Sequence, residues 1–99
     1  MNPQDIEHRL QQLNQGLSAS WVGAADRIQK TFVFEDFQAA MAFMQRVAHD
    51  AEALDHHPEW RNVYNRIEVE LTTHSAGGVT ELDFALAAKM EAACAVVSP

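Results

Sequence analysis

The chain has 99 residues, of which 47% are hydrophobic and 21% are charged. These values predict one compact domain spanning residues 1–99 and exclude an intrinsically disordered chain. The formal net charge of -7 disfavours direct binding to nucleic acid, because an acidic surface repels phosphate groups.

Two further features bear on the compartment. No apolar run is longer than that at residues 39–44, which is far shorter than the roughly 20 residues that cross a bilayer, and no basic stretch followed by an apolar one opens the chain. The single cysteine, Cys94, is expected to be a small buried side chain and cannot form an internal disulfide, which suits a reducing compartment. We therefore expect a cytoplasmic protein without a membrane segment.

A first helix is predicted to begin at Asn2 and Pro3, because a capping amide and a proline at the first helical position favour a helix start. Leucine and isoleucine recur on one helical face, and Gly16 ends the regular part. The residues of that face are Ile6, Leu10, Leu13 and Leu17.

A β-hairpin is predicted next. Its first strand begins at Trp21, its turn lies at residues 24–26 and its second strand covers residues 28–34. Alternation places Ile28, Phe32 and Phe34 on one face of the second strand. Lys30 falls on the same face, so either the alternation is imperfect or Lys30 lies at an edge with its amine in water.

The longest predicted helix is capped by Asp36 and ends by Asp55 or His56, because Pro58 disfavours helical geometry at the residue before it. Strict alternation over residues 63–73 then predicts a half-buried strand of an antiparallel sheet. Its inward-facing residues are expected to be Val63, Ile67, Val69 and Leu71.

A turn at residues 76–78 precedes the last predicted helix. Thr80 and Asp83 have the spacing of a capping box, with aspartate in place of the usual glutamate or glutamine. The order helix, strand, strand, helix, strand, helix lacks the βαβ alternation of a parallel sheet, so an α+β domain with helices on one sheet face is predicted. The last helix is expected to bury Leu82, Leu86, Met90, Ala93 and Val97.

Three carboxylates, Asp50, Glu52 and Asp55, crowd the C-terminal end of the long helix, where the helix dipole disfavours negative charge. A nearby cation would explain them. Glu52 lies one helical turn before His56, so we expect its carboxylate to contact that imidazole and to hold one tautomer. A solvated acidic face is the alternative interpretation.

Histidines are the main candidates for chemistry, because the sequence has no Ser-centred elbow, no cysteine placed beside a histidine and no phosphate-binding loop pattern. His56 and His57 are adjacent where a helix gives way to an extended segment, so both can point into one cleft. His74 is expected on the solvent-facing side of its strand, where it either takes part in chemistry or is an exposed side chain without a role. The spacing of these histidines is not that of zinc ligands on one helical face, so we expect no metal site. Asp83 is expected to cap a helix, a role that can coexist with a catalytic one.

These positions together resemble the signature of the pterin-4a-carbinolamine dehydratases. The pattern is Glu52-x-x-x-His56-His57-Pro58, followed by Tyr64, His74 and Asp83 at the family's spacing, and residues 54–60, 62–65 and 71–74 are similar to that family as well. The resemblance covers nearly the whole chain and is strongest over residues 32–90. One departure is Ser20, which stands where the family commonly has a glycine.

The resemblance implies a four-stranded antiparallel sheet with three helices packed on one face. The alternation of apolar residues predicts three strands, so the fourth would come from splitting or extending the hairpin region. The resemblance also implies a homodimer or homotetramer, which would bury the surface formed by Met41, Phe43 and Met44.

The implied activity is that of a dehydratase, a hydro-lyase that converts 4a-hydroxytetrahydropterin to quinonoid dihydropterin and water without a cofactor. Such an enzyme would support tetrahydropterin recycling for an aromatic amino-acid hydroxylase. The implied catalytic residues are His56, His57, His74, Asp83 and Glu52. The implied substrate-binding residues are His57, Trp60 and Asp55.

Two alternatives stay open. Trp60 could pack on the flat pterin ring, but a tryptophan beside Pro58 is more often explained by simple packing. The whole chain could instead be an accessory protein, because some members of the family bind or assemble partner proteins and animal members are dimerisation cofactors of a homeodomain transcription factor.

Overall fold

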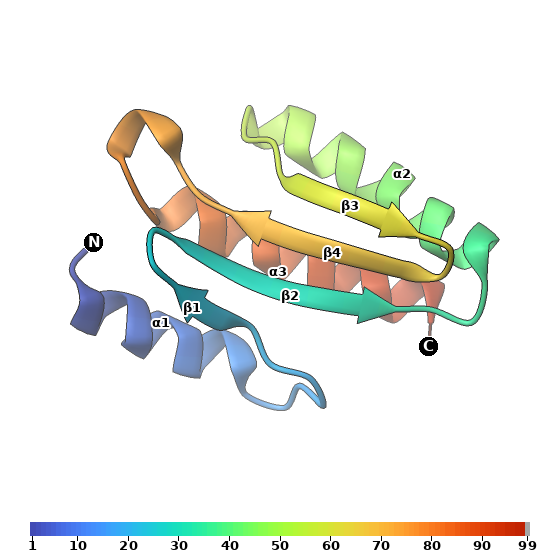
Figure 1. Cartoon of the computed structure of the whole chain (residues 1–99), viewed down its shortest axis with the longest axis horizontal. Helices are drawn as coiled ribbons and strands as arrows, with labels where there is room; N and C mark the ends of the chain where they lie inside the picture. Colours follow the sequence, from blue (N-terminus) through green and yellow to red (C-terminus); the bar gives the residue numbers. More distant parts are fainter. Residues whose placement is uncertain (99) are drawn as a thin grey trace.

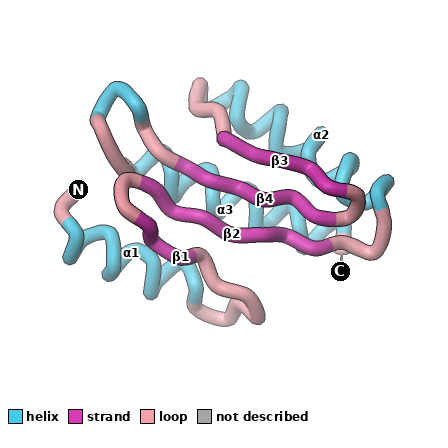
Figure 2. The backbone as a smooth tube through the Cα atoms, viewed as in Figure 1, coloured by secondary structure: helices cyan, strands magenta, loops and turns pink. Residues whose placement is uncertain are grey.

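The structure is a computed structural model, and it describes residues 1–98. A four-stranded antiparallel sheet with the order β1-β2-β4-β3 organises the chain (Figure 1). Helices cover one face of the sheet and leave the other face open (Figure 2), which confirms the predicted α+β class. The strands are β1 (Val22–Ala24), β2 (Arg27–Val33), β3 (Glu59–Val63) and β4 (Arg66–Leu71). The helices are α1 (Pro3–Asn14), α2 (Phe37–Leu54) and α3 (Glu81–Val97), with a 3₁₀ turn, η1 (His74–Ala76).

The helices begin where side chains satisfy their free backbone amides. Asn2 accepts a hydrogen bond from the amide of Asp5 at 2.8 Å, and Asp36 accepts one from the amide of Ala39 at 2.8 Å. These contacts confirm both predicted N-caps. A side chain at Gly23 would lie 3.3 Å from Leu10, so α1 packs closely on the sheet at β1.

Aromatic side chains fill the core between the sheet and α2. Phe43 from α2 lies 4.8 Å from Phe32 and 5.0 Å from Phe34, measured between ring centroids. Phe43 is fully buried within the chain, so the prediction that it forms an apolar surface with Met41 and Met44 is wrong. The two methionines are half-buried.

One inward-facing prediction for α3 is also wrong. Leu82 is 39% exposed, because Asp83 and Phe84 face the interior in the first turn of that helix. The other predicted residues are buried or half-buried, namely Leu86, Met90, Ala93 and Val97.

The strand predicted over residues 63–73 begins too early, because residues 66–71 form β4 whereas Val63 is the last residue of a separate strand, β3. A turn at residues 64–65, in which Tyr64 has a φ of 52°, joins β3 to β4 and pairs Val63 with Arg66. This two-residue turn changes the parity of the alternation, so Val63 is 43% exposed, whereas Ile67 is buried. The fourth strand is therefore β3, and it does not come from the β1-β2 hairpin. Beyond β4, Thr72 is buried and donates a hydrogen bond to the Asp26 carbonyl.

Lys30 follows a regular alternation, and its side chain is buried on the helix-covered face. Its Nζ donates to Glu91 Oε2 at 2.6 Å and to the Ala19 carbonyl at 2.9 Å, and the side chain is 7% exposed. Trp21 Nε1 donates to the same glutamate oxygen at 2.8 Å. The expectation of an edge lysine with its amine in water is therefore wrong, because Glu91 supplies the opposite charge inside.

Cys94 lies one helical turn after Glu91 and is half-buried, not fully buried as expected. Burial raises the pKa of its thiol. No helix within residues 1–98 has the length and apolar character needed to cross a membrane.

The Lys30–Glu91 pair gives a first prediction about stability. We expect Lys30→Ala to lower the free energy of unfolding by about 2 to 3 kcal/mol, because it leaves a partly buried carboxylate without its cation. Urea denaturation followed by circular dichroism measures the change. Lys89→Ala removes an exposed lysine from α3 and is the matched control, so equal losses in the two variants would argue against the role of the pair.

Candidate active site

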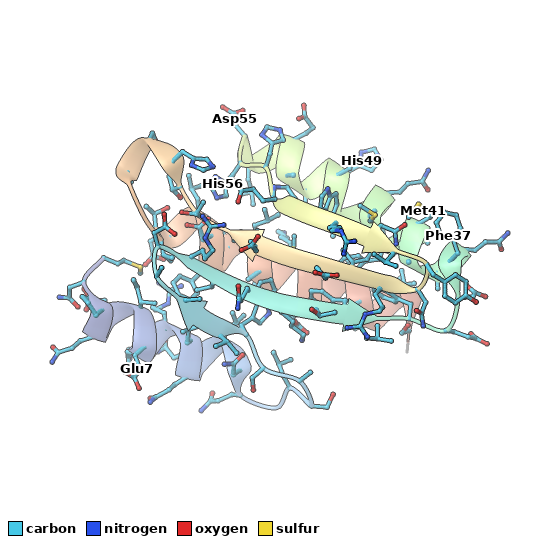
Figure 3. The ribbon with its side chains drawn as sticks, in the orientation of Figure 1. Glu7, Phe37, Met41, His49, Asp55 and His56 are labelled. Atoms are coloured by element: carbon cyan, nitrogen blue, oxygen red, sulfur yellow. The ribbon has the colours of Figure 1, made fainter. Side chains whose placement is uncertain are left out.

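The end of α2 separates the two adjacent histidines. Asp55 takes the left-handed conformation with a φ of 51°, and the amide of His56 donates to the Ala51 carbonyl at 3.0 Å. This αL cap reverses the chain. As a result His56 is buried and His57 is exposed, and Figure 3 shows Asp55 at the outer end of α2 and His56 nearer to the sheet.

Asp83 is the buried partner of His56. Nε2 of His56 lies 2.6 Å from Oδ1 of Asp83. The other carboxylate oxygen accepts from the Thr73 hydroxyl at 2.9 Å and from the Thr80 amide at 2.9 Å. An ionised carboxylate only accepts hydrogen bonds, so opposite an ionised Asp83 the Nε2 nitrogen of His56 is the donor, and Nδ1 of a neutral ring is then an acceptor.

A short hydroxyl chain completes this buried cluster. The hydroxyls of Thr73 and Thr80 are 2.8 Å apart. Since Thr73 gives its proton to Asp83, the hydroxyl of Thr80 donates to Thr73. Asp83 is thus fully buried and satisfied on both oxygens, and it combines the predicted capping role with a contact to His56.

Glu52 contacts His57, so the predicted contact with His56 is wrong. Oε1 of Glu52 lies 2.6 Å from Nε2 of His57. The one-turn spacing to His56 would hold only in a continuing helix, whereas α2 ends at Leu54 and the αL residue diverts the next side chain. Both partners are well exposed, so the pair orients the ring and adds little stability.

His74 lies at the start of η1 and is exposed, as predicted. Its Nε2 is 3.0 Å from Oε1 of Glu59. The other oxygen of Glu59 accepts from Arg27 Nη1 at 3.2 Å. Glu59 and Arg27 were not among the predicted site residues, because their link to His74 depends on the register that places β3 beside β4.

Two contacts connect the segments that carry the three histidines. Asp83 links the His56 segment to Thr73, which precedes His74. Glu59 links His74 to the start of β3, two residues after His57. The starts of β2 and β3, the end of β4 and the η1 loop lie at the same end of the molecule (Figure 1).

The remaining predicted residues lie around this cluster. Asp55 is exposed. Trp60 is half-buried and packs against the hydrophobic core, which satisfies the packing interpretation and leaves part of the ring accessible. Neither side chain has a hydrogen bond to the three histidines among residues 1–98.

Carboxylates outnumber cations beside His74. Asp26, Glu59 and Glu70 all contact the guanidinium of Arg27. The hydrogen bond from Arg27 holds the pKa of the Asp26 carboxyl below its usual value, and the charge of His74 contributes to the same shift.

Acid-base chemistry is what this arrangement supports. Residues 1–98 contain no cluster of three or more His, Cys, Asp or Glu side chains arranged to hold a metal ion. Cavities of about 480, 640 and 350 Å³ lie over the open face of the sheet, between α1 and β1, and between α2 and α3, and their linings do not include the three histidines. The histidine cluster is thus a surface site with one buried member.

The fold and these paired histidines define a small α+β protein with a polar cluster of histidines and carboxylates at one end of its sheet. The family model described as pterin 4 alpha carbinolamine dehydratase matches residues 1–93. The chain belongs to this family.

Relatives and solved structures agree with that assignment. A Bradyrhizobium diazoefficiens protein, named provisionally as a pterin-4-alpha-carbinolamine dehydratase, is 61% identical over 71 residues, which are 72% of this chain and 71% of the relative. One from Chelativorans sp., named in the same way, is 48% identical over 92 residues, 93% of this chain and 91% of the relative. A Brucella melitensis crystal structure described as a transcriptional coactivator/pterin dehydratase has a TM-score of 0.85 and 42% identity, and covers 95% of this chain and 97% of its own.

A more distant solved structure shares the fold alone. It is a pterin dehydratase-like protein described as a RuBisCO assembly factor in the alpha-carboxysome, with a TM-score of 0.64 and 21% identity. The match covers 80% of this chain and 92% of that protein.

Replacing Asp83 tests the cluster directly. We expect Asp83→Ala to lower the free energy of unfolding by about 2 to 4 kcal/mol, because it leaves His56 Nε2, the Thr73 hydroxyl and the Thr80 amide without an acceptor. Chemical denaturation measures the change. Glu81→Ala, which removes an exposed carboxylate from the same helical turn, is expected to cost less than about 1 kcal/mol, and a comparable loss in both variants would contradict the cluster's role.

Proposed function

We propose that this chain is a dehydratase that converts a 4a-hydroxytetrahydropterin to a quinonoid dihydropterin and water. The observation that carries the proposal is the pairing of each of three neighbouring histidines, through Nε2, with its own carboxylate. The partners are Asp83 for His56, Glu52 for His57 and Glu59 for His74. Family membership supports the same reaction.

The reaction needs one acid and one base. The bond between C4a and its hydroxyl breaks as the hydroxyl takes a proton and leaves as water, and the adjacent ring nitrogen forms a double bond to C4a and loses its own proton. Nothing is oxidised or reduced. Imidazoles suit both transfers, because the unperturbed pKa of histidine is about 6.5 and each ring can hold or accept a proton near neutral pH.

We assign the proton transfers to His56 and His74. In each ring a carboxylate holds a proton on Nε2, so Nδ1 is the nitrogen that exchanges a proton with the substrate. The ring that acts as the base is neutral and accepts the proton from the ring nitrogen on Nδ1, whereas the ring that acts as the acid starts as the imidazolium and gives its Nδ1 proton to the leaving hydroxyl. His57, which is exposed and paired with Glu52, is proposed to orient the pterin. The accessible part of Trp60 would pack on the flat ring, and Asp55 would contact the polar edge of the substrate.

The biological setting stays a prediction. We propose that the activity recycles the tetrahydropterin of an aromatic amino-acid hydroxylase in the cytoplasm. Assembly as a homodimer or homotetramer would cover exposed apolar side chains of α2 such as Phe37, which is 46% exposed. Size-exclusion chromatography with light scattering measures the assembly.

A role in binding a partner protein is the second candidate. The Brucella melitensis structure is described both as a transcriptional coactivator and as a pterin dehydratase, and the exposed apolar side chains of α2 would suit a partner. Catalysis ranks first because a purely structural binding module does not require three histidines with paired carboxylates. Recovery of a stoichiometric protein partner, together with no dehydratase activity, would reverse this ranking.

Histidine replacements test the proposed chemistry. We expect His56→Ala and His74→Ala each to lower the dehydration rate by about 10² to 10⁴-fold, the usual contribution of general acid-base assistance. The assay follows freshly prepared 4a-hydroxytetrahydropterin by ultraviolet absorbance with the uncatalysed rate subtracted, and circular dichroism verifies folding. His49, an exposed histidine on α2 (Figure 3), supplies the control His49→Ala. Unchanged turnover in both site variants would refute the assignment.

A further inference from the structure

Arg27 forms ionic contacts with three carboxylates on the open face of the sheet. It is the first residue of β2, and its guanidinium lies 3.1 Å from Asp26, 3.2 Å from Glu59 and 3.1 Å from Glu70. Its side chain is 27% exposed, so most of its surface is covered by neighbouring residues. Arginine suits such a position, because its planar donors address several carboxylates in fixed directions.

Glu59 is held at both of its oxygens. Oε2 accepts from Arg27 and Oε1 contacts Nε2 of His74. A glutamate at the start of an edge strand, if it had only the His74 contact, would be free to rotate about its side-chain bonds. The second contact restricts that rotation, so the position of Arg27 determines where Glu59 presents its acceptor to the imidazole.

We propose that Arg27 is a positioning residue of the histidine site, which acts through Glu59 to hold His74 in one orientation with its proton on Nε2. Its catalytic consequence rests on the proposed dehydratase function, whereas the orientation of His74 does not.

A plain structural role for Arg27 makes a different prediction. The register places Glu59 directly opposite Glu70 on β3 and β4, and like charges at such a position destabilise a sheet. Arg27 could therefore serve only to neutralise this pair. If so, removing the charge of Glu70 would make Arg27 dispensable, whereas a positioning role would persist in the double variant.

The first measurement is independent of catalysis. Three-bond couplings across χ1 of His74, obtained by NMR on isotope-labelled protein, report whether the side chain occupies one rotamer. We expect one rotamer in the unmodified chain and in Glu70→Gln, averaging among rotamers in Arg27→Gln and in Arg27→Gln/Glu70→Gln, and partial restoration in Arg27→Lys. Couplings in Arg27→Gln equal to those of the unmodified chain would overturn the proposal, as would full recovery in the double variant.

The second measurement is kinetic. We expect Arg27→Gln and the double variant to lower kcat roughly tenfold with little change in KM, less than the roughly 10²-fold loss that a 1 Å misplacement can cause. Arg61→Gln is the matched control, because Arg61 pairs with Glu68 on the same face and neither residue has a hydrogen bond to the three histidines. An unchanged kcat in Arg27→Gln would overturn the catalytic consequence. If the unmodified chain has no activity, the dehydratase function is refuted. The three-bond couplings across χ1 then test on their own whether Arg27 fixes the orientation of His74.

Discussion

The buried carboxylate of Asp83 is the interaction on which the site depends. It accepts hydrogen bonds from His56, Thr73 and Thr80, which belong to the loop after α2, the segment after β4 and the start of α3. A buried charge is tolerated only where such partners satisfy it. The same contacts that neutralise the cost of burying Asp83 therefore fix three segments at one end of the sheet, and they orient the one buried imidazole of the cluster.

The three histidines share a pairing pattern but differ in their surroundings. His56 is enclosed and receives a buried partner, whereas His57 and His74 are exposed and pair with exposed glutamates. Hydrogen bonds in the enclosed pair are less screened by water than those at the surface. The orientation of His56 is thus fixed by the fold itself, while that of His74 requires the additional Glu59–Arg27 contacts.

The ends of the helices could be predicted from residues that are neighbours in the sequence. Contacts between side chains far apart in the sequence could not be predicted in this way. The N-caps Asn2, Asp36 and Thr80 and the helix end before Pro58 are encoded by neighbouring residues, and all were predicted. The predicted face of Val63 was wrong, because a two-residue turn reverses the alternation between β3 and β4. The predicted partner of Glu52 was wrong, because the αL residue Asp55 redirects the side chain that follows it. The partners Asp83 of His56 and Glu91 of Lys30 are 27 and 61 residues away, and periodicity carries no information on such pairs.

The most direct test of the site is an NMR titration of 15N-histidine-labelled protein with a stable dihydropterin. The chain has five histidines. His8 lies on α1 and His49 on α2, and within residues 1–98 neither has a hydrogen bond to the cluster. These two histidines therefore serve as internal controls. The ring-nitrogen signals of His56, His57 and His74 are expected to shift together with a single dissociation constant while the two control signals stay in place. Shifts confined to the controls, or no shift at a saturating pterin concentration, would contradict a pterin site at these histidines.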